Sequence, residues 1–236
     1  MLILATDTSS KHGSIALARG DRERFDALEV VPLAGGTFSA QLIPQVVALL
    51  NRHHVRKEDL DAFAAATGPG SFTGLRVGLA GVKALAEVLG KPIAAVSVLE
   101  AIAAVYGIEG RVLAALDAGR NEVFVGEYEV TDDAVRLLGE SLLTCDDFLA
   151  RARDAGEPLR VATPDATLTQ LLRAHGLPCV MLDHPRADAI ARLGLRKLLA
   201  GETVSVEQLD ANYLRRSDAE IFSLPKIAAS SPKRET

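Results

Sequence analysis

The sequence predicts an α/β protein made of two related lobes, each built as three strands followed by a helix, a strand and a helix. Short apolar strands alternate with amphipathic helices along most of the 236 residues, which is typical of sheets covered by helices. The stretch "RVLAALDAGRNEVFVGEYEV" at 111–130 repeats the pattern of "MLILATDTSSKHGSIALARG" at 1–20, with an aspartate and a small polar turn between two strands. Such internal repetition indicates a duplicated unit. A hydrophobic content of 48% allows a large aliphatic core.

The first half of the chain holds the first copy of this unit. Strands are predicted at 2–8, 13–19 and 23–30, because the turns "SSKHG" and "RGDR" separate short apolar runs. An amphipathic helix follows at 39–53, where Pro44 either kinks the helix or marks its true start. The copy is completed by a buried strand at 61–67, a helix at 73–89 that Gly90 ends, a strand at 92–98 and a helix at 99–107.

The second copy begins at the strand that ends in Asp117. Two further strands are predicted, then a helix from 144, a strand at 160–163, a helix at 166–176, a strand at 178–182 and a helix at 187–200. We therefore expect one lobe at 1–106 and another at 107–222. Residues 223–236 lack periodicity, which predicts a flexible tail.

Composition excludes several function classes. The formal net charge is −5 and the basic residues are scattered, so tight nucleic-acid binding by the chain alone is not expected, although a composite RNA site with a partner stays open. Cys145 and Cys179 are isolated, which indicates neither a disulfide framework nor a structural zinc site. No basic amino-terminal region and no long apolar run is present, so we expect a cytoplasmic protein with no membrane role.

The stretch "TGPGSFTGLRVGLAG" at 67–81 is unusually rich in glycine. It lacks the lysine of a P-loop, the glycine spacing of a dinucleotide-binding loop and the Gly-x-Ser-x-Gly of a nucleophile elbow. The remaining interpretation is a glycine loop before a helix amino terminus, a generic cradle for an anion, with Ser71 or Thr73 as N-cap.

A candidate anion loop combines this glycine loop with the turn after the first strand. Backbone N–H groups and hydroxyls there would face a phosphate, while the aspartate would hold a hydrated metal ion. The alternative is that Asp7 only ends a strand and that the two serines cap an ordinary turn. The residues of the candidate loop are Asp7, Ser9, Ser10, Gly13, Gly68, Gly70 and Ser71.

Three glycines of the predicted helix at 73–89 share one face, since Gly74, Gly78 and Gly81 lie at i, i+4 and i+7 and Leu85 continues the row. Each interior glycine destabilises a helix by roughly 0.5–1 kcal/mol relative to alanine. Another backbone is therefore expected to come close to this face. It belongs either to a partner protein or to the first helix of the same lobe, and the spacing alone does not decide between them.

Catalytic patterns are scarce. The histidines form no HxxxH or HExxH pair, so no metal site is expected. Near the carboxyl end, "NYLRRSDAE" at 212–220 places Tyr213 beside Arg215 and Arg216. This segment is either a contact for RNA phosphates or a solvated helix end.

Several stretches together resemble a known family. They are "ILATDTSSKHGSIAL" at 3–17, "GPGSFTGLRVGLAGVKALA" at 68–86, "KPIAAVSVLEAIA" at 91–103, "LAALDAGRNEVFVGEY" at 113–128 and "ANYLR" at 211–215. Their combination resembles the bacterial tRNA threonylcarbamoyladenosine biosynthesis proteins called TsaB, the dimerisation subunits of that system. The resemblance covers most of the first 130 residues and returns near Tyr213.

The resemblance implies an actin-like fold, as in sugar kinases and Hsp70-like ATPases, and a subunit without catalysis of its own. The catalytic paralogue in that system, TsaD, carries a metal-binding HxxxH pair on the helix that corresponds to 39–53. Here the segment reads "TFSAQLIPQVVALL" at 37–50, with no histidine. Phe38 stands where family members often keep a single histidine before the proline. The resemblance further implies that the isolated chain binds no cofactor tightly, with ATP or ADP in the complex.

The resemblance also implies partners. In the family this subunit pairs with TsaD through the first two helices, and a small P-loop ATPase called TsaE joins the pair. The subunit alone forms a homodimer. Only the complex as a whole binds tRNA. On that basis we expect a partner interface made of Leu42, Val46, Leu49, Gly74, Gly78, Gly81 and Leu85. A Gly78→Leu substitution should then break the partnership and leave the fold intact.

Two other function classes remain to be weighed. A small actin-like ATPase or kinase would hold a nucleotide between its lobes with Asp7, Asp117 and the loop at 68–74. A peptidase is disfavoured, because the sequence offers neither a metal pair nor a nucleophile with a base.

Overall fold

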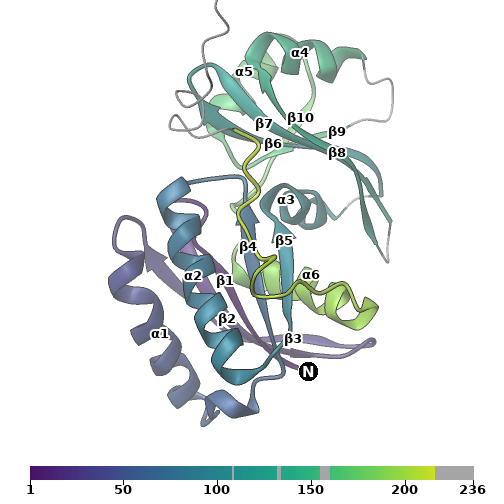
Figure 1. Ribbon diagram of the computed structural model, residues 1–236. Helices are drawn as coiled ribbons and strands as arrows, with labels where there is room; N and C mark the ends of the chain where they lie inside the picture. Colours follow the sequence, from purple (N-terminus) through teal and green to yellow (C-terminus); the bar gives the residue numbers. More distant parts are fainter. Residues whose placement is uncertain (108, 132–133, 155–159, 216–236) are drawn as a thin grey trace, which may run out of the picture.

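The computed structural model describes residues 1–107, 109–131, 134–154 and 160–215, which form two lobes with one five-stranded sheet each. Figure 1 shows one lobe below the other, with the amino terminus in the lower one. The predicted tail at 223–236 lies outside the described residues.

The first sheet has the strand order β3-β2-β1-β4-β5. β1 pairs antiparallel with β2 and parallel with β4. β1 and β4 are buried along their whole length, because both faces of this sheet are covered and continuous apolar strands suit such a position. The strands are β1 (Leu2–Asp7), β2 (His12–Gly20), β3 (Phe25–Ala34), β4 (Ala62–Gly68) and β5 (Ile93–Ser97).

Two helices cover one face of the first sheet. They are α1 (Phe38–Arg52) and α2 (Phe72–Leu89), and a 3-10 turn at Lys57–Asp59 follows α1. Pro44 lies inside α1 and is exposed, so it does not mark the start of the helix. Ser71 is the N-cap of α2, because its side-chain oxygen accepts a hydrogen bond from the Gly74 N–H at 3.3 Å. Gly90 ends α2 in the left-handed conformation.

The second sheet repeats the first, with the order β10-β9-β6-β7-β8. β6 stands where β1 stands in the first sheet, antiparallel to β7 and parallel to β9. This equivalence confirms the duplicated unit. The elements are β6 (Gly110–Gly119), β7 (Glu122–Val130), β8 (Val135–Thr144), α4 (Cys145–Asp154), β9 (Arg160–Thr163), α5 (Ala166–Ala174) and β10 (Cys179–Met181).

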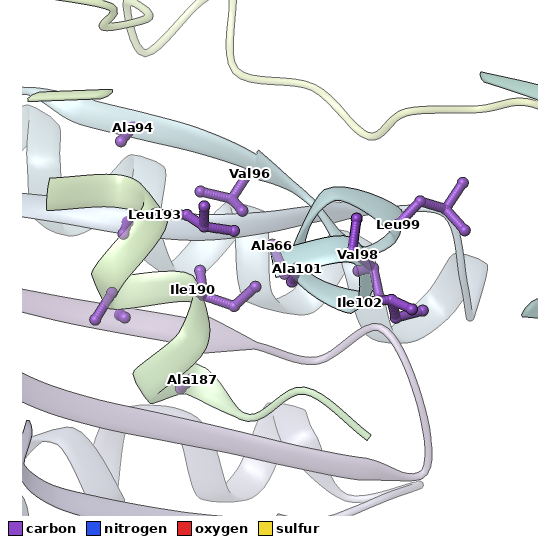
Figure 2. Close-up of a cluster of buried hydrophobic side chains, with 14 of the residues drawn as sticks. Ala66, Ala94, Val96, Val98, Leu99, Ala101, Ile102, Ala187, Ile190 and Leu193 are labelled. Carbon is purple, nitrogen blue, oxygen red and sulfur yellow. The ribbon is translucent and has the colours of Figure 1, made fainter. Parts of the chain in front are cut away.

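The remaining two helices are exchanged between the lobes. α6 (Ala187–Ala200), from the second half of the chain, packs on β1, β2 and β4 of the first sheet. α3 (Val98–Tyr106), from the first half, packs on β6 and β7 of the second sheet. Both helices share one apolar cluster that reaches into each sheet, part of which is shown in Figure 2 with Ile102 of α3 and Ile190 of α6. A boundary near 106–110 therefore separates the strands of the two sheets, but each sheet is also covered by a helix from the other side of that boundary.

The chain then returns along both lobes. The strap, defined here as residues 202–215, pairs Val204 with Ile93 at the edge of β5. It continues past β4, where the Asn212 N–H donates to the Thr67 carbonyl at 2.7 Å. At its end Arg215 bonds the Ala118 carbonyl of the second lobe at 2.9 Å. Figure 1 shows this yellow-green segment passing from the lower to the upper lobe.

Candidate functional site between the lobes

The two strand-end aspartates close equivalent turns. Asp7 Oδ1 accepts a hydrogen bond from the Ser9 N–H at 2.8 Å, and Asp117 Oδ1 accepts one from the Gly119 N–H at 2.7 Å. Asp7 is only 2% exposed. Burial raises the pKa of its carboxyl, and the hydrogen bonds from Ser9 oppose that rise. Asp7 therefore has the structural role that the sequence left open as an alternative.

A cleft of about 910 Å³ lies between the lobes. It receives Ser9 and Ser10 from the turn after β1, together with Gly70 and Ser71 from the loop before α2. The two segments are joined where the Ser71 N–H donates to the Ser9 carbonyl at 2.6 Å. Part of the candidate anion loop is thus assembled at one site.

The other members of the candidate loop do not line this cleft. Gly13 lies against Phe38, since a Cβ there would be 2.4 Å from the ring, and Gly68 is buried beside Leu75. Asp7 closes its own turn, as described above. The structure thus brings four of the seven predicted residues to the cleft and leaves Asp7, Gly13 and Gly68 packed against the protein outside its lining.

The cleft also gathers charged groups that the sequence did not connect. Asp165, at the start of α5, accepts a hydrogen bond from the Asp117 N–H at 2.7 Å and lies 3.9 Å from His184 Nε2. Burial lowers the pKa of His184, while Asp165 and Asp7 oppose that change. Lys11 from the turn before β2 and His12 from the start of β2 also line the cleft. These residues come from separate strand ends, which is why no local motif predicted them.

One carboxylate connects the strap to both lobes. Glu140 of β8 accepts hydrogen bonds from Ser97 at the end of β5, from Tyr128 of β7 and from the Asn212 side chain of the strap. The segment around Glu140 carries no motif, and its partners lie 12 to 72 residues away in sequence. Only the fold could bring them together.

Tyr213 of the strap contacts α2 rather than belonging to a helix end. Its ring centroid lies 5.4 Å from that of Phe72, the first residue of α2. Arg76, one turn further along α2, places its guanidinium 3.8 Å from the centroid of the Phe72 ring and donates from Nε to the Tyr213 hydroxyl at 3.1 Å. All three residues line the cleft.

The predicted glycine face of α2 packs inside its own lobe. A Cβ on Gly78 would lie 2.1 Å from Thr8 Oγ1, and one on Gly74 would lie 2.2 Å from the Thr8 carbonyl oxygen. A Cβ on Gly81 would lie 2.7 Å from Leu42 of α1. The expectation that these glycines face a partner is wrong, because the end of β1 and the side chains of α1 already occupy the space.

The leucines and valine expected in the interface are also internal. Leu42, Val46 and Leu49 are at most 3% exposed and belong to the core beneath α1 and α2. Leu85 is half-buried against the same core. Five of the apolar residues that these two helices expose form what we call the α1–α2 surface: Ile43, Val47, Ala80, Ala84 and Val88.

Two further findings concern membrane-spanning helices and metal-binding groups. Within the described ranges, no helix is long and apolar enough to cross a membrane. The same part of the chain holds no group of three or more His, Cys, Asp or Glu side chains arranged to bind a metal ion.

Comparison with known proteins identifies the family. A family profile described as "TsaD: tRNA N6-adenosine threonylcarbamoyltransferase" matches residues 30–179. The chain is 32% identical to the "tRNA threonylcarbamoyladenosine biosynthesis protein TsaB" of Bacillus subtilis, over 93% of this chain and 96% of the relative. The Escherichia coli protein of the same name is 30% identical with the same coverage.

Solved structures agree with the sequence comparison. A Pseudomonas aeruginosa protein described as having similarity to the peptidase YeaZ superimposes with a TM-score of 0.74 at 30% identity, covering 91% of this chain and 99% of that one. A structure named YeaZ from the same organism gives 0.72 at 28% identity, with 90% and 99% covered. The duplicated fold is therefore the actin-like one of these relatives, and the chain belongs to the TsaB family.

Proposed function

We propose that this chain is an accessory subunit in the formation of threonylcarbamoyladenosine beside the anticodon of tRNA, and that it supports the transferase TsaD without catalysing the transfer. The observation that carries the proposal is the match to proteins named for this biosynthesis over nearly the full length of both chains. A contact that favours the active state of a partner is sufficient for such a role.

The α1–α2 surface is the proposed docking site for TsaD. Val88 is 77% exposed, Val47 53% and Ile43 43%, and the small, exposed Ala80 and Ala84 share the face of α2 that carries Val88. Small residues beside exposed valines allow another helix to approach closely, and apolar area removed from water would stabilise the contact. We propose that the same surface forms a homodimer when TsaD is absent, and that TsaE joins the heterodimer.

The features of α1 and of the cleft support a role without catalysis. α1 carries no histidine, whereas the paralogous transferase is expected to hold its metal ion from the corresponding helix. The aspartates at the strand ends are used to close their own turns. We propose accordingly that the isolated chain binds no cofactor tightly and that ATP or ADP belongs to the assembled complex.

The docking proposal is tested by co-expressing the chain with TsaD from the same genome and measuring mass by size-exclusion chromatography with light scattering. We expect a stoichiometric complex with the natural chain and none with Val47→Arg or Ala84→Arg, since a buried unpaired charge opposes association. Leu137→Arg is the matched control, because Leu137 is 55% exposed on β8 of the other lobe. If Val47→Arg and Ala84→Arg form the complex as well as the control does, the α1–α2 surface is not the docking site.

The cleft itself favours a second candidate, an actin-like ATPase or kinase that holds a nucleotide between its lobes. Its volume of about 910 Å³ and its lining from both lobes suit a nucleotide. Isothermal titration of the isolated chain with Mg-ATP tests it. Binding that is lost in Lys11→Ala would favour this enzyme class over the accessory subunit, and absence of binding would remove the candidate.

A further inference from the structure

An aromatic platform stands at the edge of the cleft and has no part in the docking proposal. We use this name for Phe72, Arg76 and Tyr213, whose contacts are given above. Phe72 and Tyr213 remain 40% and 38% exposed although their rings touch. Two aromatic rings and a guanidinium thus lie together beside the cleft, and all three residues are partly exposed to solvent.

The platform is held in place although it is exposed. Asn212, the residue before Tyr213, bonds the Thr67 carbonyl in one lobe and Glu140 in the other. Two residues after Tyr213, Arg215 bonds the Ala118 carbonyl. A ring positioned in advance by its neighbours loses little conformational freedom when a ligand stacks on it. The hydrogen bonds of the strap therefore hold the partly exposed Tyr213 ring in a fixed position beside the cleft.

The charges around the platform favour an anionic partner. In the part of the chain that the structure describes, Lys11 and Arg76 form no ion pair with a carboxylate, and both line the cleft. The platform also begins at the amino terminus of α2, where the helix dipole is positive. The two carboxylates of the cleft, Asp117 and Asp165, belong to the second lobe, where each accepts a backbone N–H.

We propose that the aromatic platform stacks an unpaired base of single-stranded RNA, with the adjoining phosphates at Lys11 and Arg76. Aromatic side chains and arginine planes are the groups on which proteins stack splayed bases. The inference rests on the proposed function, in which the RNA is tRNA and the stacked base belongs to one of its loops. The net charge of −5 indicates that the platform contributes to a site shared with the partner rather than binding RNA strongly by itself.

The test is a fluorescence anisotropy titration of labelled tRNA transcript with the complex of this chain and TsaD. We expect Tyr213→Ala to weaken binding about tenfold, because stacking on one base contributes on that order. Tyr213→Phe is the matched control: it keeps the ring, removes the hydroxyl that bonds Arg76, and should bind nearly as the natural chain does. Arg76→Gln should lower the salt dependence by about one phosphate contact.

Three outcomes would overturn the proposal. The first is that Tyr213→Ala binds tRNA as the natural chain does. The second is that Tyr213→Ala no longer forms the complex with TsaD in size-exclusion chromatography, which would make the platform a protein contact. The third is that AMP or UMP competes at concentrations as low as unlabelled RNA, which would indicate that the ligand is a free nucleotide. If no complex with TsaD forms at all, the same variants are titrated as isolated chains at low salt. Loss of RNA binding in Tyr213→Ala would then support the platform even though the accessory role had failed.

Discussion

Thr8 and Gly78 meet at the point where the chain leaves β1 beneath α2. Thr8 is 2% exposed, and a Cβ on Gly78 would also lie 3.3 Å from its Cβ and Cγ2. Because Thr8 is fixed in the turn that Asp7 closes, it cannot move aside freely. At the scale of a single residue, the absence of a side chain at Gly78 therefore allows α2 to pack closely against Thr8 at the end of β1.

We expect Gly78→Leu to lower the free energy of unfolding by about 1–3 kcal/mol or more, since overpacking forces side chains and backbone apart. Urea denaturation followed by circular dichroism measures the change. Gln170→Leu is the control, because Gln170 is exposed on α5, away from the α1–α2 surface, and should change stability little. Equal midpoints for the two variants would show that the space beneath Gly78 is not filled by Thr8.

At the scale of an element, α2 depends on its start. The Ser71 side chain accepts the Gly74 N–H, whereas Thr73 is exposed within the first turn. Removing an N-cap oxygen costs about 1 kcal/mol. We expect Ser71→Ala to lower stability by about that amount and Thr73→Ala to leave it nearly unchanged, as measured by thermal unfolding. A larger loss for Thr73→Ala would mean that the cap is Thr73 in solution.

At the scale of the whole molecule, the exchange of α3 and α6 makes each lobe depend on the other half of the chain. Without α6, one face of the first sheet would expose Ala5, Ala64 and Ala94, which are fully buried. We expect a fragment of residues 1–107 expressed alone to lack a cooperative unfolding transition, because this apolar face has no cover.

Co-expression of that fragment with residues 108–236 is the control, and it should restore a cooperative transition in circular dichroism by supplying α6 in trans. A fragment 1–107 that unfolds cooperatively by itself would contradict the dependence of the first lobe on α6. The lobes would then be independent folding units despite the shared core.

Periodicity and the repeated aspartate turn were sufficient to predict the order of strands and helices and the duplication of the unit. These features are local, because alternation and helical spacing depend on residues a few positions apart. The sequence also grouped Ser9 and Ser10 with Gly70 and Ser71, and these four residues meet at the cleft, since a strand end and a helix start lie at the same edge of a sheet.

Only the tertiary structure decided which apolar residues face water. α1 carries apolar residues on adjoining faces, and the choice between Leu42 and Ile43 depends on packing against α2, β2 and β3, which are separate elements of the chain. The aromatic platform depends on a hydrogen bond across 137 residues, and the cover of the first sheet comes from the far end of the chain. Local pattern determines what an element is, whereas burial depends on its neighbours in space, and these are set when distant segments pack together.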